Sequence, residues 1–64
     1  MTPEAFSRWL AAMKAAGLAR SDAECARLLD RTPRRILDMK KRGTDRVTAL
    51  ACQALYKKLK PWPQ

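Results

Sequence analysis

The 64-residue chain has no histidine, only two cysteines and only two glycines. Histidine is a common general base and zinc ligand, so its absence removes most catalytic pairs and metal clusters. Cys25 and Cys52 are too far apart in the chain for a metal cluster, and two isolated glycines do not form a phosphate-binding loop. We therefore expect no enzyme activity, no metal and no cofactor.

Long apolar runs are also missing. No stretch approaches the roughly 20 apolar residues that a membrane span requires, and no segment has the pattern of a signal peptide. These absences predict a cytoplasmic protein with reduced thiols and no membrane partner. A chain this short has no room for a sensing domain, so we expect no small-molecule ligand. Residues 1–64 should form one domain near the lower size limit for independent folding.

Acidic residues are scarce, because 6 Asp and Glu stand against 14 Lys and Arg, which gives a net charge of +8. This excess favours an anionic partner through counterion release, with an affinity that falls as salt rises. Half of the basic residues lie between positions 31 and 46, namely Arg31, Arg34, Arg35, Lys40, Lys41, Arg42 and Arg46. A solvated basic surface without a partner is the alternative interpretation of this run.

Apolar residues recur at helical spacing behind cap residues. Thr2 and Pro3 suit the N-cap and first turn of a helix at about 3–16, which Gly17 ends. Its core stripe, at i, i+3, i+4 and i+7, is Phe6, Trp9, Leu10 and Met13.

A second helix is predicted at 22–29 by a capping box, in which Ser21 is the N-cap and Glu24 reaches back to it. Its apolar stripe is expected to be Cys25, Leu28 and Leu29, with Cys25 a buried free thiol.

A third helix is predicted at 33–42. Thr32 serves as N-cap, Pro33 takes the first helical position, and Gly43 ends the helix in left-handed geometry. Because only a few residues separate it from the second helix, the two should form a helix-turn-helix with its core at residues 21–43.

The last helix is predicted at 46–59, capped by Thr44 or Asp45 and stopped by the proline-rich tail. One apolar band is expected to close the core, comprising Val47, Leu50, Ala51 and Ala54. A second band beside it contains Thr48, Cys52, Leu55, Tyr56 and Leu59. This second band packs either on the first helix and Trp62 or on a second chain, and the preferred interpretation is a homodimer interface of Cys52, Leu55, Tyr56 and Leu59. The expected fold is an all-α, compact bundle of four helices.

The third helix separates into two faces at about 100° per residue. Ile36 and Met39 lie together as anchors, while Arg34, Asp38 and Lys41 point the other way. A helix that is anchored on one face and basic on the other suits the major groove of B-DNA, which admits an α-helix and offers guanine acceptors.

The segment from Ser21 to Gly43 resembles the helix-turn-helix regulators of the Cro and phage-repressor family, also called the XRE family. In the motif that starts at Asp22, Ala26 matches the small residue of the first helix, and Ile36 and Met39 match apolar positions of the second. Asp30 replaces the usual turn glycine, and aspartate tolerates left-handed geometry.

The flanks extend the resemblance over nearly the whole chain, since residues 1–6 (MTPEAF), 47–51 and 61–63 are similar to the opening, closing helix and tail of small family members. The resemblance implies a cytoplasmic, bacterial or phage-encoded repressor of a phage or mobile-element operon. A homodimer would present two reading helices to an inverted repeat in double-stranded DNA, with half-sites roughly 34 Å apart.

Site roles follow from the two faces. We expect Arg34 to contact guanine; Asp38 either accepts from cytosine or orients Arg34, and Leu37 either meets a thymine methyl or fills a helix edge. The expected phosphate contacts are Ser21, Arg35, Lys41, Arg42 and Arg46.

Two other functions remain open from the sequence. The basic domain could instead be a protein-interaction module, such as an antitoxin-like protein or a nuclease inhibitor that occupies an acidic groove. It could also bind nucleic acid without sequence preference.

Overall fold

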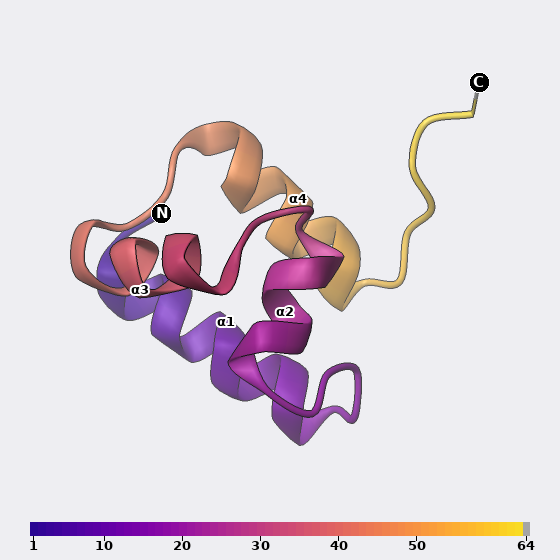
Figure 1. Cartoon of the computed structure of the whole chain (residues 1–64). Helices are drawn as coiled ribbons and strands as arrows, with labels where there is room; N and C mark the ends of the chain where they lie inside the picture. Colours follow the sequence, from indigo (N-terminus) through magenta and orange to yellow (C-terminus); the bar gives the residue numbers. More distant parts are fainter. Residues whose placement is uncertain (64) are drawn as a thin grey trace.

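The computed structural model describes residues 1–63, which form four α-helices and no strand (Figure 1). The helices are α1 (Pro3–Ala15), α2 (Asp22–Leu28), α3 (Pro33–Arg42) and α4 (Arg46–Tyr56). The predicted all-α architecture is confirmed, and the first three helices have the predicted bounds to within one residue. The prediction for α4 was three residues too long at its C-terminal end.

All four helices begin at a polar side chain that caps them. Each cap oxygen accepts a hydrogen bond from the backbone N–H three residues later, and the caps are Thr2, Ser21, Thr32 and Asp45. These bonds, 2.8–3.2 Å long, satisfy donors that would otherwise have no partner in the helix. Strong local start signals explain why the helix beginnings follow from the sequence.

Three helices end in the same way, at a residue with positive φ. These residues are Gly17 (φ 73°), Asp30 (φ 56°) and Lys58 (φ 60°). At each, the next residue bonds back to the carbonyl five residues earlier, as in Leu59 N–H to Ala54 O at 2.9 Å. The prediction that Asp30 takes left-handed geometry is confirmed. The turn at Lys58, rather than the prolines beyond it, ends α4 at Tyr56.

The core is built around one face of α1. Phe6, Trp9, Leu10 and Met13 are all buried, as their spacing predicts. The Phe6 and Trp9 rings stack with centroids 5.6 Å apart. The Trp9 indole N–H also donates to the Cys52 carbonyl at 2.9 Å, which joins α1 to α4 across the core.

The two apolar bands of α4 are reversed relative to the prediction. Thr48 and Cys52 face the core, with 6% and 1% of their surface exposed, while Val47 and Leu50 are 69% and 61% exposed. The Trp9 indole of α1 binds the Cys52 carbonyl, so the side of α4 that carries the small Thr48 and Cys52 side chains lies against α1. Cys52, proposed as a dimer contact, is therefore a core residue.

In α2, Cys25 is buried as predicted, but Leu28 was wrongly placed in the core stripe. Leu28 is 43% exposed, whereas Leu29 is buried as predicted, and Ala26, which was not in the predicted stripe, is also buried in the core. Burial raises the pKa of the Cys25 thiol, and it raises the pKa of the Cys52 thiol to about 11. Both thiols are free and protonated at neutral pH.

The loop between α3 and α4 is joined to the start of the chain. The Thr44 N–H donates to the Met1 carbonyl at 2.8 Å, and the Met1 amine donates to the Thr44 carbonyl at 2.8 Å. A Cβ on Gly43 would collide with the Met1 carbonyl oxygen. Gly43 has φ 84° and ψ −168°, so it ends α3 with an extended ψ rather than in the left-handed helical geometry expected.

Candidate nucleic-acid interface

Helix α3 is held to the molecule by one face. Ile36 and Met39 are only 1% and 2% exposed, and they pack into the same core as the α1 side chains. Burial of two such side chains stabilises the docked helix by about 1.5–3 kcal/mol each. The opposite face of the helix is therefore fixed in orientation and turned to solvent.

The outward face of α3 is defined by Arg34, Leu37 and Lys41, which lie at i, i+3 and i+7. All three are exposed, and Leu37 retains 59% of its surface. More than half of the Leu37 side chain is thus open to solvent on this face. Within residues 1–63, neither Arg34 nor Lys41 has an ion-pair partner. A guanidinium and an ammonium thus flank an apolar side chain on a rigid support.

Asp38 lies beside this outward face and binds two other arginines. Arg35 Nη1 is 3.3 Å from one carboxylate oxygen, and Arg42 Nε is 3.3 Å from the other. The expected orientation of Arg34 by Asp38 is not formed. Asp38 instead holds Arg35 and Arg42 in one row along the helix, although both guanidinium groups remain largely exposed.

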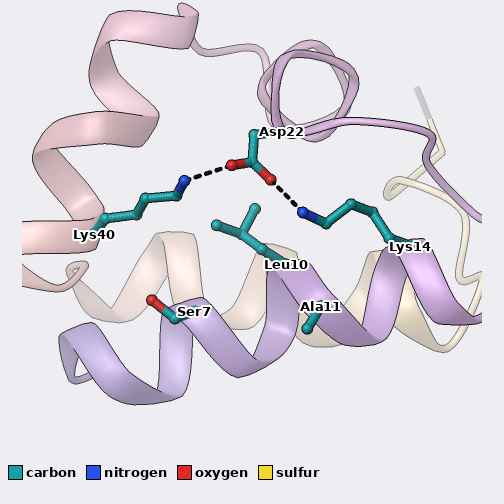
Figure 2. Close-up of a pocket in the computed structure, with 6 residues that line it drawn as sticks. All are labelled: Ser7, Leu10, Ala11, Lys14, Asp22 and Lys40. Carbon is teal, nitrogen blue, oxygen red and sulfur yellow. Dashed lines mark hydrogen bonds and ion pairs between the residues drawn. The ribbon is translucent and has the colours of Figure 1, made fainter.

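A polar cluster that sequence reasoning missed joins three helices. Asp22 of α2 accepts from Lys40 of α3 at 2.5 Å and from Lys14 of α1 at 2.9 Å, so the two lysines approach opposite oxygens of one carboxylate (Figure 2). The hydrogen bonds from Lys40 and then from Lys14 hold the pKa of Asp22 below its ordinary value. Leu10 lies beneath the carboxylate in the same shallow cleft.

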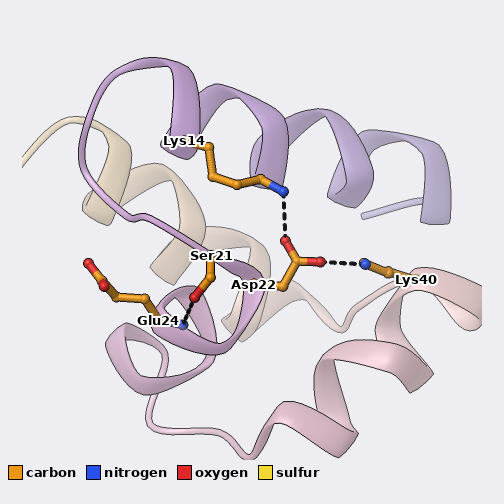
Figure 3. Close-up of polar contacts among 5 residues, drawn as sticks. All are labelled: Lys14, Ser21, Asp22, Glu24 and Lys40. Carbon is orange, nitrogen blue, oxygen red and sulfur yellow. Dashed lines mark hydrogen bonds and ion pairs between the residues drawn. The ribbon is translucent and has the colours of Figure 1, made fainter.

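This cluster removes one cation, Lys40, from the charges that α3 presents on its outward face. Lys40 is directed toward Asp22 and away from the outward face, so it belongs to the support of the helix rather than to its presented surface (Figure 3). A signal was present in the sequence, because Lys40 follows the buried Ile36 by four residues and so lies on the same side of α3.

Ser21 and Arg46 lie at the N-terminal ends of other helices. The Ser21 hydroxyl accepts the Glu24 N–H at 3.2 Å, and a hydroxyl that accepts in this way keeps its own hydrogen as a donor (Figure 3). Among the described residues, the Glu24 carboxylate does not accept from the Ser21 backbone N–H, the reciprocal bond expected for a full capping box. Arg46 is exposed at the first position of α4.

Of the four residues predicted to form a dimer interface, only part remains accessible. Cys52 is buried, and Leu55 is partly buried against the core. Tyr56 and Leu59 are 43% and 63% exposed. The large exposed side chains of α4 itself therefore include Val47 and Leu50, which sequence reasoning had assigned to the core.

Other kinds of site find little support in the part of the chain that the structure describes. No three potential metal ligands gather there. None of the four helices is long and apolar enough to cross a membrane. Comparison with protein-family models, with curated proteins and with solved structures finds no match for this chain.

Proposed function

We propose that this chain is a helix-turn-helix regulator that binds double-stranded DNA with sequence specificity and acts as a repressor. In this proposal α3 enters the major groove, and a homodimer binds an inverted repeat. The observation that carries the proposal is the outward face of α3. It places Arg34, Leu37 and Lys41 on one exposed stripe, while the opposite side is fixed by Ile36 and Met39.

Each side chain of that stripe has a role that fits its chemistry. Arg34 lies in the first turn of α3 and is positioned for a bidentate contact with guanine O6 and N7. Leu37, one turn later, suits a thymine methyl group. Arg35 and Arg42, aligned by Asp38, suit phosphates on the flanks of the groove, together with Lys41, Arg46 and Ser21. Asp38, which pairs with these two arginines, has a carboxylate that could also accept from cytosine N4.

The rigidity of the support favours reading of specific bases. Apolar anchors hold one side of α3, and the Lys40–Asp22 pair ties the helix to α2. Base discrimination needs donors that stay in place, whereas nonspecific phosphate binding needs only charge. The clustered guanidinium groups therefore favour a specific reader over the two alternatives, a protein-interaction module and a nonspecific nucleic-acid binder.

The direct test is selection of binding sites from a random duplex library by the purified protein at near-physiological salt. We expect an enriched inverted repeat with half-sites about 10 base pairs apart. Arg34→Ala should cost about 1–3 kcal/mol on the selected site and relax the preference at one base position in each half-site.

Two further variants make this test specific. Arg34→Lys keeps the charge but loses the bidentate fork, so it should also relax the preference. Arg8→Ala removes the same charge from the exposed surface of α1 and should leave the selected sequence unchanged. If no sequence is enriched and binding simply collapses as salt rises, the protein is a nonspecific binder. If no duplex is retained, a protein partner becomes the explanation for the basic surface.

A further inference from the structure

The solvent side of α4 carries an apolar surface whose large side chains are left uncovered by residues 1–63. We call Val47, Leu50, Ala51 and Ala54 the neutral face, because they lie at i, i+3, i+4 and i+7 on one side of the helix. Ala51 lies at the inner edge of this face, where it is partly buried against the core. Val47 and Leu50 are more than 60% exposed. Next to them is a hollow of about 310 Å³. Its apolar lining includes Ala51, Ala54, Leu28 and Leu59, and Asp30 and Lys60 are the charged residues at its edge.

This region is unusual in its charge. From Val47 to Tyr56 no residue is charged, although 31% of the chain is charged. A helix surface that only meets solvent normally carries charged side chains. In residues 47–56, by contrast, charged side chains are missing from every side of the helix, including the side that does not contact the core.

We propose that the neutral face is the surface through which two copies of this chain associate. This inference rests on the homodimer of the proposed function and assigns its interface. The charge of the chain favours a second copy over an acidic partner at this face. Two chains of net charge +8 repel each other, and they approach at the lowest electrostatic cost where neither carries charge. An acidic partner would instead gain most at the basic surface of α3.

A modest interface would occupy a small part of the surface of this chain. A standard interface buries about 800 Å² per partner, and weaker ones less than about 600 Å². The chain exposes 4992 Å² in total, so the contact would use about one eighth of its surface. Leu28, Val47, Leu50 and Leu59 would form the apolar centre, and Arg46 and Lys57 would lie at the rim. We expect a dissociation constant of roughly 10–100 µM without DNA.

The experiment is sedimentation equilibrium of the free protein at concentrations from about 5 to 500 µM, which span that dissociation constant. The wild-type mass should rise from 7.3 kDa toward twice that value. Leu50→Glu and Val47→Glu should each weaken association at least about 100-fold, because a glutamate would be buried without a partner.

The matched control is Leu37→Glu, since Leu37 and Leu50 are 59% and 61% exposed. Leu37→Glu should self-associate like the wild type, and circular dichroism should show all variants folded.

The outcomes separate this inference from the proposed function. A wild-type mass of 7.3 kDa over the whole range would overturn the interface. Equal dissociation of the Leu37→Glu and Leu50→Glu variants would do the same, since the effect would not be local to α4. If Leu50→Glu breaks the dimer but site selection finds no DNA sequence, the proposed interface is supported and only the DNA-reading function is rejected.

Discussion

At the scale of single residues, Asp22 is the side chain that connects the most elements. Its two oxygens are shared between Lys14 of α1 and Lys40 of α3, and all three side chains are about one third to two fifths exposed. One exposed ion pair contributes about 0–1 kcal/mol, so the value of this cluster lies in two pairs that share one carboxylate. Asp22 thus fixes α3 without using any residue of its outward face.

Replacing Asp22 with asparagine keeps the size of the side chain but removes both ion pairs. We expect Asp22→Asn to lower the free energy of unfolding by about 1 kcal/mol at pH 7, a fall in Tm of about 4–8 °C for a domain this small. Because the folded state lowers the pKa of Asp22, this contribution is present above the ordinary value of 3.8 and is lost as pH falls below it. Thermal melts by circular dichroism between pH 2 and 7 measure both effects.

Glu24→Gln is the matched control for that prediction. It removes the same charge from the first turn of α2, where Glu24 has no ion-pair partner among the described residues. The control should change Tm little. If Asp22→Asn were as acid-sensitive as the wild type, the assigned role of the carboxylate would be wrong.

The burial of a side chain could be predicted where it depends only on the spacing of residues within one helix. The faces of α3 follow from a period of 3.6 residues, and the burial of Ile36 and Met39 confirms them. The Lys40–Asp22 pair spans 18 residues and depends on how α2 and α3 cross, which the pattern within either helix does not encode. Within α3, Asp38 was expected either to orient Arg34 or to accept from cytosine, but it pairs with Arg35 and Arg42, because arginines lie at both i−3 and i−4 and helical spacing does not say which one binds.

At the scale of helices, α4 shows where a sequence pattern is ambiguous. It carries apolar residues on two adjacent bands, and periodicity alone does not say which band faces the core. The choice depends on contacts with α1, because the Trp9 indole binds the Cys52 carbonyl and so turns the band with Thr48 and Cys52 toward the core. This orientation leaves Val47 and Leu50 in solvent.

The end of α4 offers a stability prediction. Lys58 has φ 60°, a conformation that costs an L-residue with a Cβ about 1–2 kcal/mol and costs glycine nothing. After the greater backbone entropy of glycine in the unfolded chain is subtracted, Lys58→Gly should stabilise the fold by about 0.5–1 kcal/mol. Urea unfolding measures the change.

Lys57→Gly is the control for charge, because Lys57 has φ −82° and gains nothing from glycine. It should be neutral or slightly destabilising. Equal stabilisation by the two variants would show that relief of charge repulsion, not the backbone conformation of Lys58, is the cause.

At the scale of the whole molecule, charge is distributed unevenly between helices. Helix α3 carries Arg34, Arg35, Lys40, Lys41 and Arg42, whereas α4 has no charged residue after Arg46. In the proposed complex the basic helix meets DNA and the uncharged one meets a second copy. The central side chains of the two surfaces are different, and Arg46, at the start of α4, lies at the edge of both.

This division predicts the salt dependence of DNA binding. If the four proposed cationic phosphate contacts form in each chain, the slope of log K against log salt should be about −7 for a dimer. Arg46→Ala should reduce the magnitude of that slope by about 2, one contact in each chain, without changing the selected sequence. Fluorescence anisotropy of a labelled duplex at several salt concentrations measures it. A slope that Arg46→Ala leaves unchanged would remove Arg46 from the set of phosphate contacts.

The two tryptophans differ strongly in their exposure to solvent. Trp9 is 7% exposed and donates its indole N–H to Cys52 in α4, while Trp62 is 90% exposed on the tail that leads away from the bundle (Figure 1). A water-soluble quencher therefore reaches one indole and not the other. The chain carries two built-in optical labels, of which one reports the closure of α1 on α4 and the other the surroundings of the tail.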